Sequence, residues 1–250
     1  ELEQQARDAY TGSCGYLGYD GDALRDRNGD RIQYPGGGGD LTVNGWGVGW
    51  WYVSEAKLWG GNYGFQVAPS ATDNKLEIPV LGQAQSTSFG LSDLYVQPIN
   101  LGWRTQHADF VAGLGLYAPT GRYTAGADDN LGMGMWSFEI SGGTTVYFDD
   151  AKTWTFATTA FYEIHSEKDG TDVRVGDILT LEGGLGKSFM DGAASVGISY
   201  YAQWKVTDDD LGGFVPPDQL DFIGNLFGES AQRYRIDITH HGGNHYGNIR

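Results

Sequence analysis

Cysteine, proline and positive charge are scarce in this sequence of 250 residues. The single cysteine, Cys14, has no partner with which to form a disulfide inside the chain. Only 7 prolines occur, and the 40 glycines follow no strict triplet period, which argues against a disordered or collagen-like chain. Lysines and arginines number 16 against 32 aspartates and glutamates, so the formal net charge is -16. Because an acidic surface repels phosphates, we expect no nucleic-acid partner.

Long apolar runs are missing as well. No stretch of about 18 consecutive apolar residues occurs, which predicts that the chain has no transmembrane helix. The mean hydropathy of -0.37 is typical of soluble proteins, but this index is a poor guide to a β-barrel, because every second strand residue can be polar. The length fits one large β domain or two ordinary ones. We interpret residues 1–250 as a single domain, with a polar segment at 1–8 and an irregular tail at 241–250.

The chain does contain a regular alternation between large apolar residues and small ones, which is clearest in residues 110–123, FVAGLGLYAPTGRY. One side of an extended chain carries Phe110, Ala112, Leu114 and Leu116, and the other carries Val111, Gly113, Gly115 and Tyr117. Pro119 and Gly121 then end the strand. An apolar face opposite a nearly bare face predicts the wall of a β-barrel, with lipid outside and a lumen inside.

Similar patterns along the chain give a count of about 10 strands. The expected strands are residues 9–19, 41–53, 61–68, 92–104, 110–117, 136–148, 154–165, 179–186, 195–206 and 232–240. Tight turns alternate with long polar loops, and the long loops are 20–40, 70–91, 119–133, 166–176 and 207–231. This asymmetry, together with aromatic residues near strand ends, favours an all-β, antiparallel transmembrane β-barrel over a soluble β-sandwich.

The strand expected at 92–104 changes its apolar side at Pro98. Leu94 and Val96 have one parity, whereas Ile99 and Leu101 have the other. Because proline cannot donate a hydrogen bond to a neighbouring strand, we expect a β-bulge at this position.

Several stretches, taken in order, resemble one known family. They are DGDALRDRNG (20–29), LWGGNYG (58–64), SDLYVQPINLGW (92–103), FVAGLGLYAPTGRY (110–123), NLGMGMWSFE (130–139), GDILTLEGGLGK (176–187) and VTDD (206–209). The family comprises bacterial outer-membrane channels encoded beside aromatic-degradation operons, the "meta-pathway of phenol degradation" proteins. The resemblance covers most of residues 9–210.

The resemblance implies a monomeric outer-membrane barrel of 12 strands that admits hydrophobic, often monoaromatic, molecules. The sequence departs from this pattern at residues 240–250, HHGGNHYGNIR, where such barrels usually have a strand that ends on an aromatic residue. Either the final hairpin is missing from this chain, or the barrel closes with fewer strands.

Charged and aromatic residues also occur at positions with the parity of the lumen. The charged residues are Glu139, Glu163, Glu182, Lys205, Arg233 and Arg235, and the aromatic residues are Tyr147, Phe161 and Tyr201. Opposed acidic and basic walls would orient a polar substituent of a permeant; alternatively, these groups pair with one another and fill a small barrel. The aromatic rings would stack against an aromatic permeant or simply occupy volume. Glycines of the same parity are expected to leave lumen space, namely Gly113, Gly115, Gly184, Gly186 and Gly197.

Arg122 and Tyr123 are expected at the outer mouth, because they follow the strand at 110–117. There the loop would gate entry. Arg122 would also bind either the acidic residues Asp128 and Asp129 or lipopolysaccharide phosphates.

Signals for a metal ion are weak. The loop at 26–30, DRNGD, is followed by Arg31 and lacks the glycine and closing glutamate of a calcium loop. The acidic run at 208–210 is typical of a solvated loop. His240, His241 and His245 have no carboxylate at a fixed spacing. We therefore expect no metal and no other cofactor.

No catalytic constellation is evident either. Ser92 does not lie in a nucleophile elbow because the second glycine is absent, and His165 has lumen parity, away from lipid substrates. The leading hypothesis is a passive outer-membrane channel for small hydrophobic, monoaromatic molecules, in contact with membrane lipid and lipopolysaccharide. The alternatives are a structural or adhesive barrel whose acidic loops bind ions or partners, and a soluble acidic β-barrel that serves as a binding module.

Overall fold

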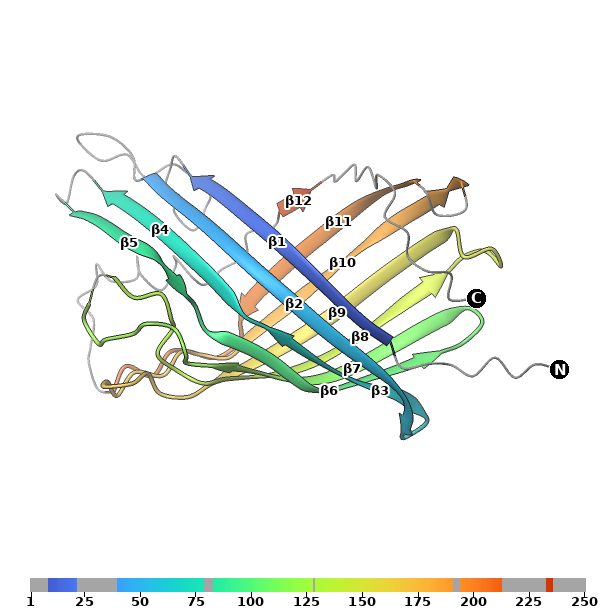
Figure 1. The fold of residues 1–250 in the computed structure, drawn as a ribbon, viewed down its shortest axis with the longest axis horizontal. Helices are drawn as coiled ribbons and strands as arrows, with labels where there is room; N and C mark the ends of the chain where they lie inside the picture. Colours follow the sequence, from blue (N-terminus) through green and yellow to red (C-terminus); the bar gives the residue numbers. More distant parts are fainter. Residues whose placement is uncertain are drawn as a thin grey trace.

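The protein folds as one large, strongly curved antiparallel sheet (Figure 1). The computed structural model describes residues 9–21, 40–78, 83–127, 129–190, 194–212 and 233–235. The strands are β1 (Ala9–Gly21), β2 (Asp40–Leu58), β3 (Gly61–Ala68), β4 (Ser70–Ile78), β5 (Gln83–Leu91), β6 (Leu94–Arg104), β7 (Ala108–Ala118), β8 (Ser137–Tyr147), β9 (Trp154–His165), β10 (Ile178–Phe189), β11 (Ala194–Lys205) and β12 (Arg233–Arg235). No helix long and apolar enough to cross a membrane is found among these residues.

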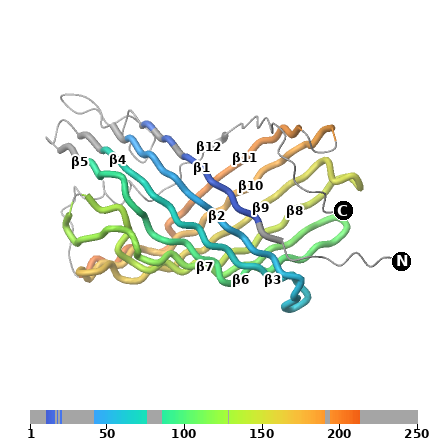
Figure 2. Tube along the Cα trace, in the orientation of Figure 1, coloured from blue at the N-terminus to red at the C-terminus, as the bar shows by residue number. Residues whose placement is uncertain are grey.

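Sequential neighbours pair along most of the sheet, in the order β12-β11-β10-β9-β8-β7-β6-β3-β2, and β1 and β4 also pair with β2. β3 and β4 lie end to end on β2 and are separated by Pro69. The next strands in the sheet are also placed end to end, because β6 pairs with β3 and β5 pairs with β4. No pairing between β1 and β12 is found among the described residues. The long, tilted strands are easily followed along the Cα trace (Figure 2).

The two faces of the sheet have opposite chemistry, and the polar face is the buried one. Along β8, Ser137, Glu139 and Ser141 are buried, whereas Phe138 and Ile140 are each 53% exposed. A soluble β-sandwich would bury its apolar face. Among the described residues, only three hydrophobic side chains are buried, those of Leu101, Leu131 and Met135. We call the face that carries Glu139 the inner face, and the other the outer face.

The predicted difference in loop length between the two ends of the barrel is confirmed. Short connections join β2 to β3, β6 to β7, β8 to β9 and β10 to β11, and they lie together at one end of the sheet (Figure 1). The loops after β7 and β9 are longer and lie at the other end. The bulge predicted at Pro98 is confirmed, because the β6–β7 register shifts between Val96 and Ile99.

The prediction of a long loop over residues 70–91 is wrong. This stretch forms β4 and β5, which extend the sheet next to the first half of β2. Both faces of this extension carry polar residues, for example Asn44, whose Nδ2 donates a hydrogen bond to Asp73 Oδ1 at 2.8 Å. The apolar alternation that marks membrane-spanning strands is therefore absent from β4, although the backbone pairing continues.

The prediction of a strand over 232–240 is tested only in part. Residues 233–235 form β12, which pairs with β11, and residues 236–240 lie outside the described residues. The polar segment at 1–8, the core of the first loop at 22–39 and the tail at 241–250 also lie outside them.

Candidate channel lining

Hydrogen-bonded side chains reach across β7 from both of its neighbours. Tyr95 of β6 donates its hydroxyl to Glu139 Oε1 of β8 at 2.6 Å. Gly115 of β7 lies beneath this bond, and a Cβ at that position would be 2.6 Å from the Tyr95 hydroxyl oxygen. Side chains from the two strands that flank a third converge most easily on the concave side of a sheet, and the burial of Glu139 and Ser141 agrees with their face being the inside of the curved sheet.

A second bridge lies one step along the same strands. Gln97 Nε2 donates a hydrogen bond to Ser141 Oγ at 3.2 Å, above Gly113. Asn100 Nδ2 donates to Gln97 Oε1 at 2.7 Å and extends the network. Gln97 and Ser141 are both buried. The two bridges make a polar, well-connected inner surface over β6, β7 and β8.

The inner-face glycines therefore do not all leave lumen space, contrary to the prediction. The space above Gly113 and Gly115 is filled by the two bridges. Cβ atoms at Gly184 and Gly197 would lie within 2.8 Å of backbone carbonyl oxygens. At Gly186 the nearest atom to an added Cβ would be Thr155 Oγ1, at an ordinary 3.4 Å. Gly186 is the one position of the five that could take a side chain without displacing its neighbours.

Three glutamates lie on the inner face of adjacent strands. Glu139 and Glu163 are directly opposed in the β8–β9 register, and Glu182 is opposed to Tyr201 in the β10–β11 register. Glu139 is 5% exposed and bonded to Tyr95. None of the three carboxylates takes part in an ion pair within the described part of the chain. The inner face therefore carries a negative charge that no neighbouring cation neutralises there.

Lys205 lies on the inner face but is not opposed to the glutamates. Its Nζ lies 2.8 Å from both carboxylate oxygens of Asp209, in the loop that follows β11. Burial alone would raise the pKa of Asp209, but hydrogen bonds from the Gly176 N–H and from Lys205 outweigh it, and the pKa is lowered. Arg233 and Arg235 pair through their backbones with Tyr201 and Ser199. Their side chains lie outside the described residues.

The predicted aromatic residues have the expected parity but different surroundings. Tyr147 is near the short-turn end, where its hydroxyl donates to Asp109 Oδ2 at 2.7 Å and Lys152 Nζ lies 4.1 Å from its ring centroid. Phe161 is opposed to Ser141 in the β8–β9 register, and Tyr201 is 40% exposed.

Tyr95 and Gln97 belong to the inner surface and were not predicted from the sequence, whereas Tyr117 has the inner parity that its strand predicted. The rings of Tyr95 and Tyr117 pack with their centroids 4.6 Å apart. The bulge at Pro98 changes the parity of β6 midway, so Tyr95 and Gln97 share a face with Asn100. Applying the predicted parity change to the polar residues of β6 as well as the apolar ones would have identified them.

The loop after β7 is firmly attached to the barrel. Asp93, only 6% exposed, accepts the N–H of Gly121 at 2.9 Å and the N–H of Met133 at 2.7 Å. One carboxylate thus connects the two ends of the loop to the junction between β5 and β6. Arg122 forms an ion pair with Asp129 at 3.2 Å, as one of the alternatives predicted. Asp128 lies outside the described residues.

Tyr123, the other predicted mouth residue, lies against Gly134, which has a φ of 67°. A Cβ at Gly134 would collide with the tyrosine ring, so both the backbone conformation and the close contact require glycine. Tyr123 therefore packs within the loop.

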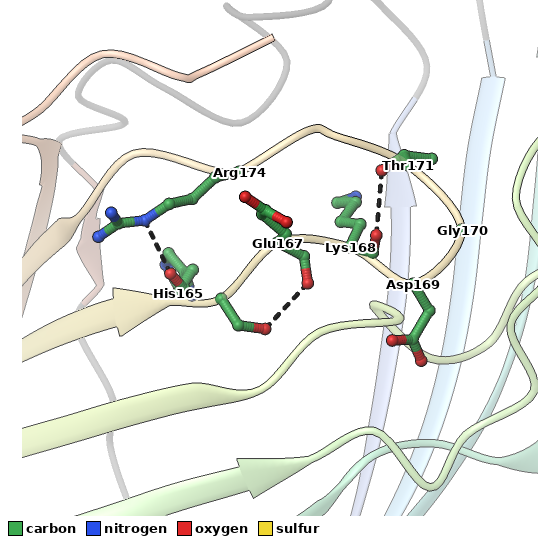
Figure 3. Close-up of a pocket in the computed structure, with 8 residues that line it drawn as sticks. His165, Glu167, Lys168, Asp169, Gly170, Thr171 and Arg174 are labelled. Carbon is green, nitrogen blue, oxygen red and sulfur yellow. Dashed lines mark hydrogen bonds between the residues drawn. The ribbon is translucent and has the colours of Figure 1, made fainter. Parts of the chain in front are cut away.

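The loop after β9 surrounds an open, polar cavity of about 580 Å³ (Figure 3). Arg174 closes one side by donating from Nε to the His165 carbonyl oxygen at 2.9 Å, while Glu167, Lys168 and Asp169 line the rest. The loop is joined to its neighbours by backbone hydrogen bonds, including those between Arg174 and Asp210. A cavity with this charged lining suits water better than an apolar molecule.

Ser137 and His165 are hydrogen-bonded, with Oγ and Nδ1 2.8 Å apart, but their geometry does not suit catalysis. Both residues are buried, and His165 Nε2 has no partner among the described residues, so no carboxylate orients the imidazole. No group of three or more potential metal ligands was found in the described part of the chain. The candidate ligands at 26–30 and at His240, His241 and His245 lie outside it.

The curved antiparallel sheet, the apolar outer face, the polar inner face and the unequal loops define an outer-membrane type of β-barrel. The same fold occurs in the crystal structure of an outer membrane channel from Pseudomonas putida F1, with a TM-score of 0.71 and 17% identity, over 83% of this chain and 76% of that chain. Residues 21–223 match the family described as "Putative MetA-pathway of phenol degradation", and the chain belongs to this family. Among curated proteins, none matches the sequence.

Proposed function

We propose that the protein is a passive channel of the bacterial outer membrane for small hydrophobic molecules with a single aromatic ring. The observation that carries the proposal is the inverted burial of β8, with Glu139 inside and Phe138 and Ile140 outside. An apolar outer face suits lipid, and a polar inner face suits a hydrated passage. Membership of a family described by phenol degradation supports an aromatic permeant.

The proposed lining comprises the predicted residues on the inner face. These are Glu139, Glu163, Glu182, Lys205, Tyr147, Phe161 and Tyr201, with Arg233 and Arg235 on β12 and with Arg122 and Tyr123 in the outer loop. Exposed inner-face rings such as Tyr201 offer stacking surfaces to an aromatic permeant. The glutamates disfavour anions, because like charges about 4 Å apart repel by about 1 kcal/mol in water and about 4 kcal/mol near a protein surface. Neutral phenols are therefore the preferred class over aromatic carboxylates.

A non-enzymatic, monomeric, single-domain barrel without a cofactor is part of this proposal. The buried Ser137–His165 pair, for which no orienting acid is found in the described ranges, supports transport without chemistry. The proposed environment is membrane lipid, with lipopolysaccharide at the loop end. There Arg122 is still 43% exposed although it is paired with Asp129.

The test is an uptake assay with purified protein in vesicles whose outer leaflet is lipopolysaccharide and whose lumen holds a phenol-oxidising enzyme. Phenol should be consumed faster with the protein than without it, and an external aromatic carboxylate of similar size should be taken up more slowly. Single-channel conductance measured on the same preparation reports whether the barrel is open.

A barrel that gives neither uptake nor current would contradict the channel and favour the alternative, a structural or adhesive barrel. That alternative is supported by the contact between two outer loops. Arg174 in the loop after β9 and Asp210 in the loop after β11 are joined by paired backbone hydrogen bonds. A protein that stays monodisperse without detergent would contradict both membrane proposals.

A further inference from the structure

The outer face of strands β6 to β11 carries a single charged residue, Lys187. The registers place it on the outer face, opposite Trp154 of β9 and Val196 of β11. All other outward positions of these six strands hold apolar residues, glycine, threonine or tyrosine. An ammonium group on a lipid-facing wall is costly unless hydrogen-bond partners and opposite charge compensate it.

The surroundings of Lys187 hold the ammonium group in place. Its Nζ lies 5.1 Å from the centroid of the Trp154 ring and 5.9 Å from that of Phe189, within the range of cation–π attraction. It also donates a hydrogen bond to Thr153 Oγ1, which in turn donates to Asp149 Oδ2 at 2.7 Å. An ammonium group has three donors, and Thr153 is the one acceptor found for it among the described residues, so two donors are available.

The position along the barrel sets the depth of the group in the bilayer. Lys187 lies two residues before the end of β10, at the end of the barrel with the short turns. Exposed aromatic side chains gather at this end, including Trp59, Phe148, Trp154 and Phe189. Such residues lie at the level of the lipid headgroups in membrane proteins. The Lys187 ammonium group is therefore at the depth of lipid phosphates and away from the hydrocarbon core.

We infer that Lys187, Trp154, Phe189 and Thr153 form a binding site for the phosphate group of a glycerophospholipid on the outer wall of the barrel. The phosphate accepts hydrogen bonds from the two remaining ammonium donors. The Asp149 carboxylate behind Thr153 compensates part of the lysine charge from the turn, and the phosphate compensates it from the lipid side. The acyl chains lie along the apolar residues above it, such as Leu185 and Ile198, which are 42% and 55% exposed. This site lies on the opposite face of the wall from the proposed channel lining, so the inference does not depend on permeation.

Lys152 provides a matched control. It lies in the turn at the same end, with Nζ 4.1 Å from the Tyr147 ring centroid, but Tyr147 faces the inside of the barrel. The two lysines thus have the same charge and a similar aromatic contact on opposite faces. Of the two, only Lys187 occupies an outward position on the lipid-facing wall.

The experiment measures lipid retained by the full-length protein in native mass spectrometry, after titration with phosphatidylglycerol in detergent. Lys187→Met should weaken lipid binding about fivefold, the effect of one basic residue at a lipid surface, whereas Lys187→Arg and Lys152→Met should bind as the wild type does. Phe189→Leu keeps an apolar side chain and should weaken binding to a smaller extent. Heat-modifiable migration on gels checks that each variant is folded.

Three results would overturn the inference. The first is wild-type lipid binding by both Lys187→Met and Phe189→Leu. The second is an equal loss of lipid binding in Lys152→Met, which would show that any positive charge at this end of the barrel has the same effect. The third is full competition by inorganic phosphate at the concentration of the lipid, which would define an anion site with no need of a membrane.

Discussion

Tyr95 and Glu139 meet above a strand to which neither belongs. Their hydrogen bond of 2.6 Å runs from β6 to β8 and covers Gly115 of β7. The glycines that leave this face of β7 without side chains thus lie directly beneath a polar bridge. The bridge couples β6 to β8 through side chains, across the backbone of β7, and it makes this part of the inner wall sensitive to substitution.

Removing the donor of the bridge should cost more than altering the acceptor. Tyr95→Phe leaves the buried Glu139 carboxylate without a partner, and we expect a loss of about 1–3 kcal/mol in the free energy of unfolding. Glu139→Gln keeps an oxygen that accepts the bond and should cost less. Urea unfolding in detergent measures both. In the double variant the losses should not add, and strict additivity would show that the two side chains do not interact.

A tryptophan should have different effects at the two inner-face glycines Gly115 and Gly186. Gly115→Trp displaces the Tyr95–Glu139 bridge and should lower stability by about 1–3 kcal/mol or more, as overpacking does. A Cβ at Gly186 makes only ordinary contacts, the nearest with Thr155 Oγ1 at 3.4 Å, so Gly186→Trp should change unfolding far less than Gly115→Trp while it slows permeation. Unfolding and uptake are measured on the same preparations. Unchanged uptake in Gly186→Trp would place the permeation path elsewhere.

The unpaired glutamates should control selectivity for charge. Glu163→Gln and Glu182→Gln each remove one negative charge from the inner face, and neither side chain has an ion-pair partner to lose within the described residues. Uptake of an aromatic carboxylate should rise about fivefold for each charge removed, while uptake of neutral phenol stays the same. Asp208→Asn, at an exposed loop position, is the control. A parallel rise for both solutes would point to a wider pore and not to a weaker field.

The Lys205–Asp209 pair should make the outer loops dependent on pH. The folded state lowers the pKa of Asp209 from its ordinary value of 3.8, so the unfolded loop binds the proton more readily than the folded one. The stabilisation is therefore fully present above the ordinary value and is lost as the pH falls through the lower, folded value. Hydrogen exchange at the Gly176 amide, which bonds to Asp209, should increase over this window. Asp209→Asn should remove the pH response, and its persistence would assign the response to another group.

Asp93 should hold the loop after β7 closed. Asp93→Asn replaces one carboxylate oxygen by an amide NH2 that only donates, so one of the two N–H groups, of Gly121 or of Met133, loses its acceptor. We expect local opening to become easier by about 1–3 kcal/mol, visible as faster hydrogen exchange at these two amides and faster proteolysis between them. Global unfolding should change less. Unaltered exchange at both amides would mean that other contacts hold the loop.

Much of the wall could be predicted from local sequence. Phe138 and Ile140 alternate with Glu139 and Ser141, and a period of two assigns each residue to a face without knowledge of its partners. The strands within residues 70–91 could not be predicted in this way, because no apolar face alternates with a polar one there. Asp73 of β4 and its partner Asn44 of β2, for example, are both polar. There the backbone ladder alone defines the strands.

The sequence by itself determined the β-barrel class, the difference between short turns and long loops, the bulge at Pro98 and the alternation of the two faces along β7 to β11. These properties depend on spacing along one strand. Only the tertiary structure decided that Gly115 is covered by Tyr95 and Glu139, and that Lys205 binds Asp209 and not a glutamate. These contacts depend on the register between strands and on the path of the loops, because both bring together residues that are distant in the chain.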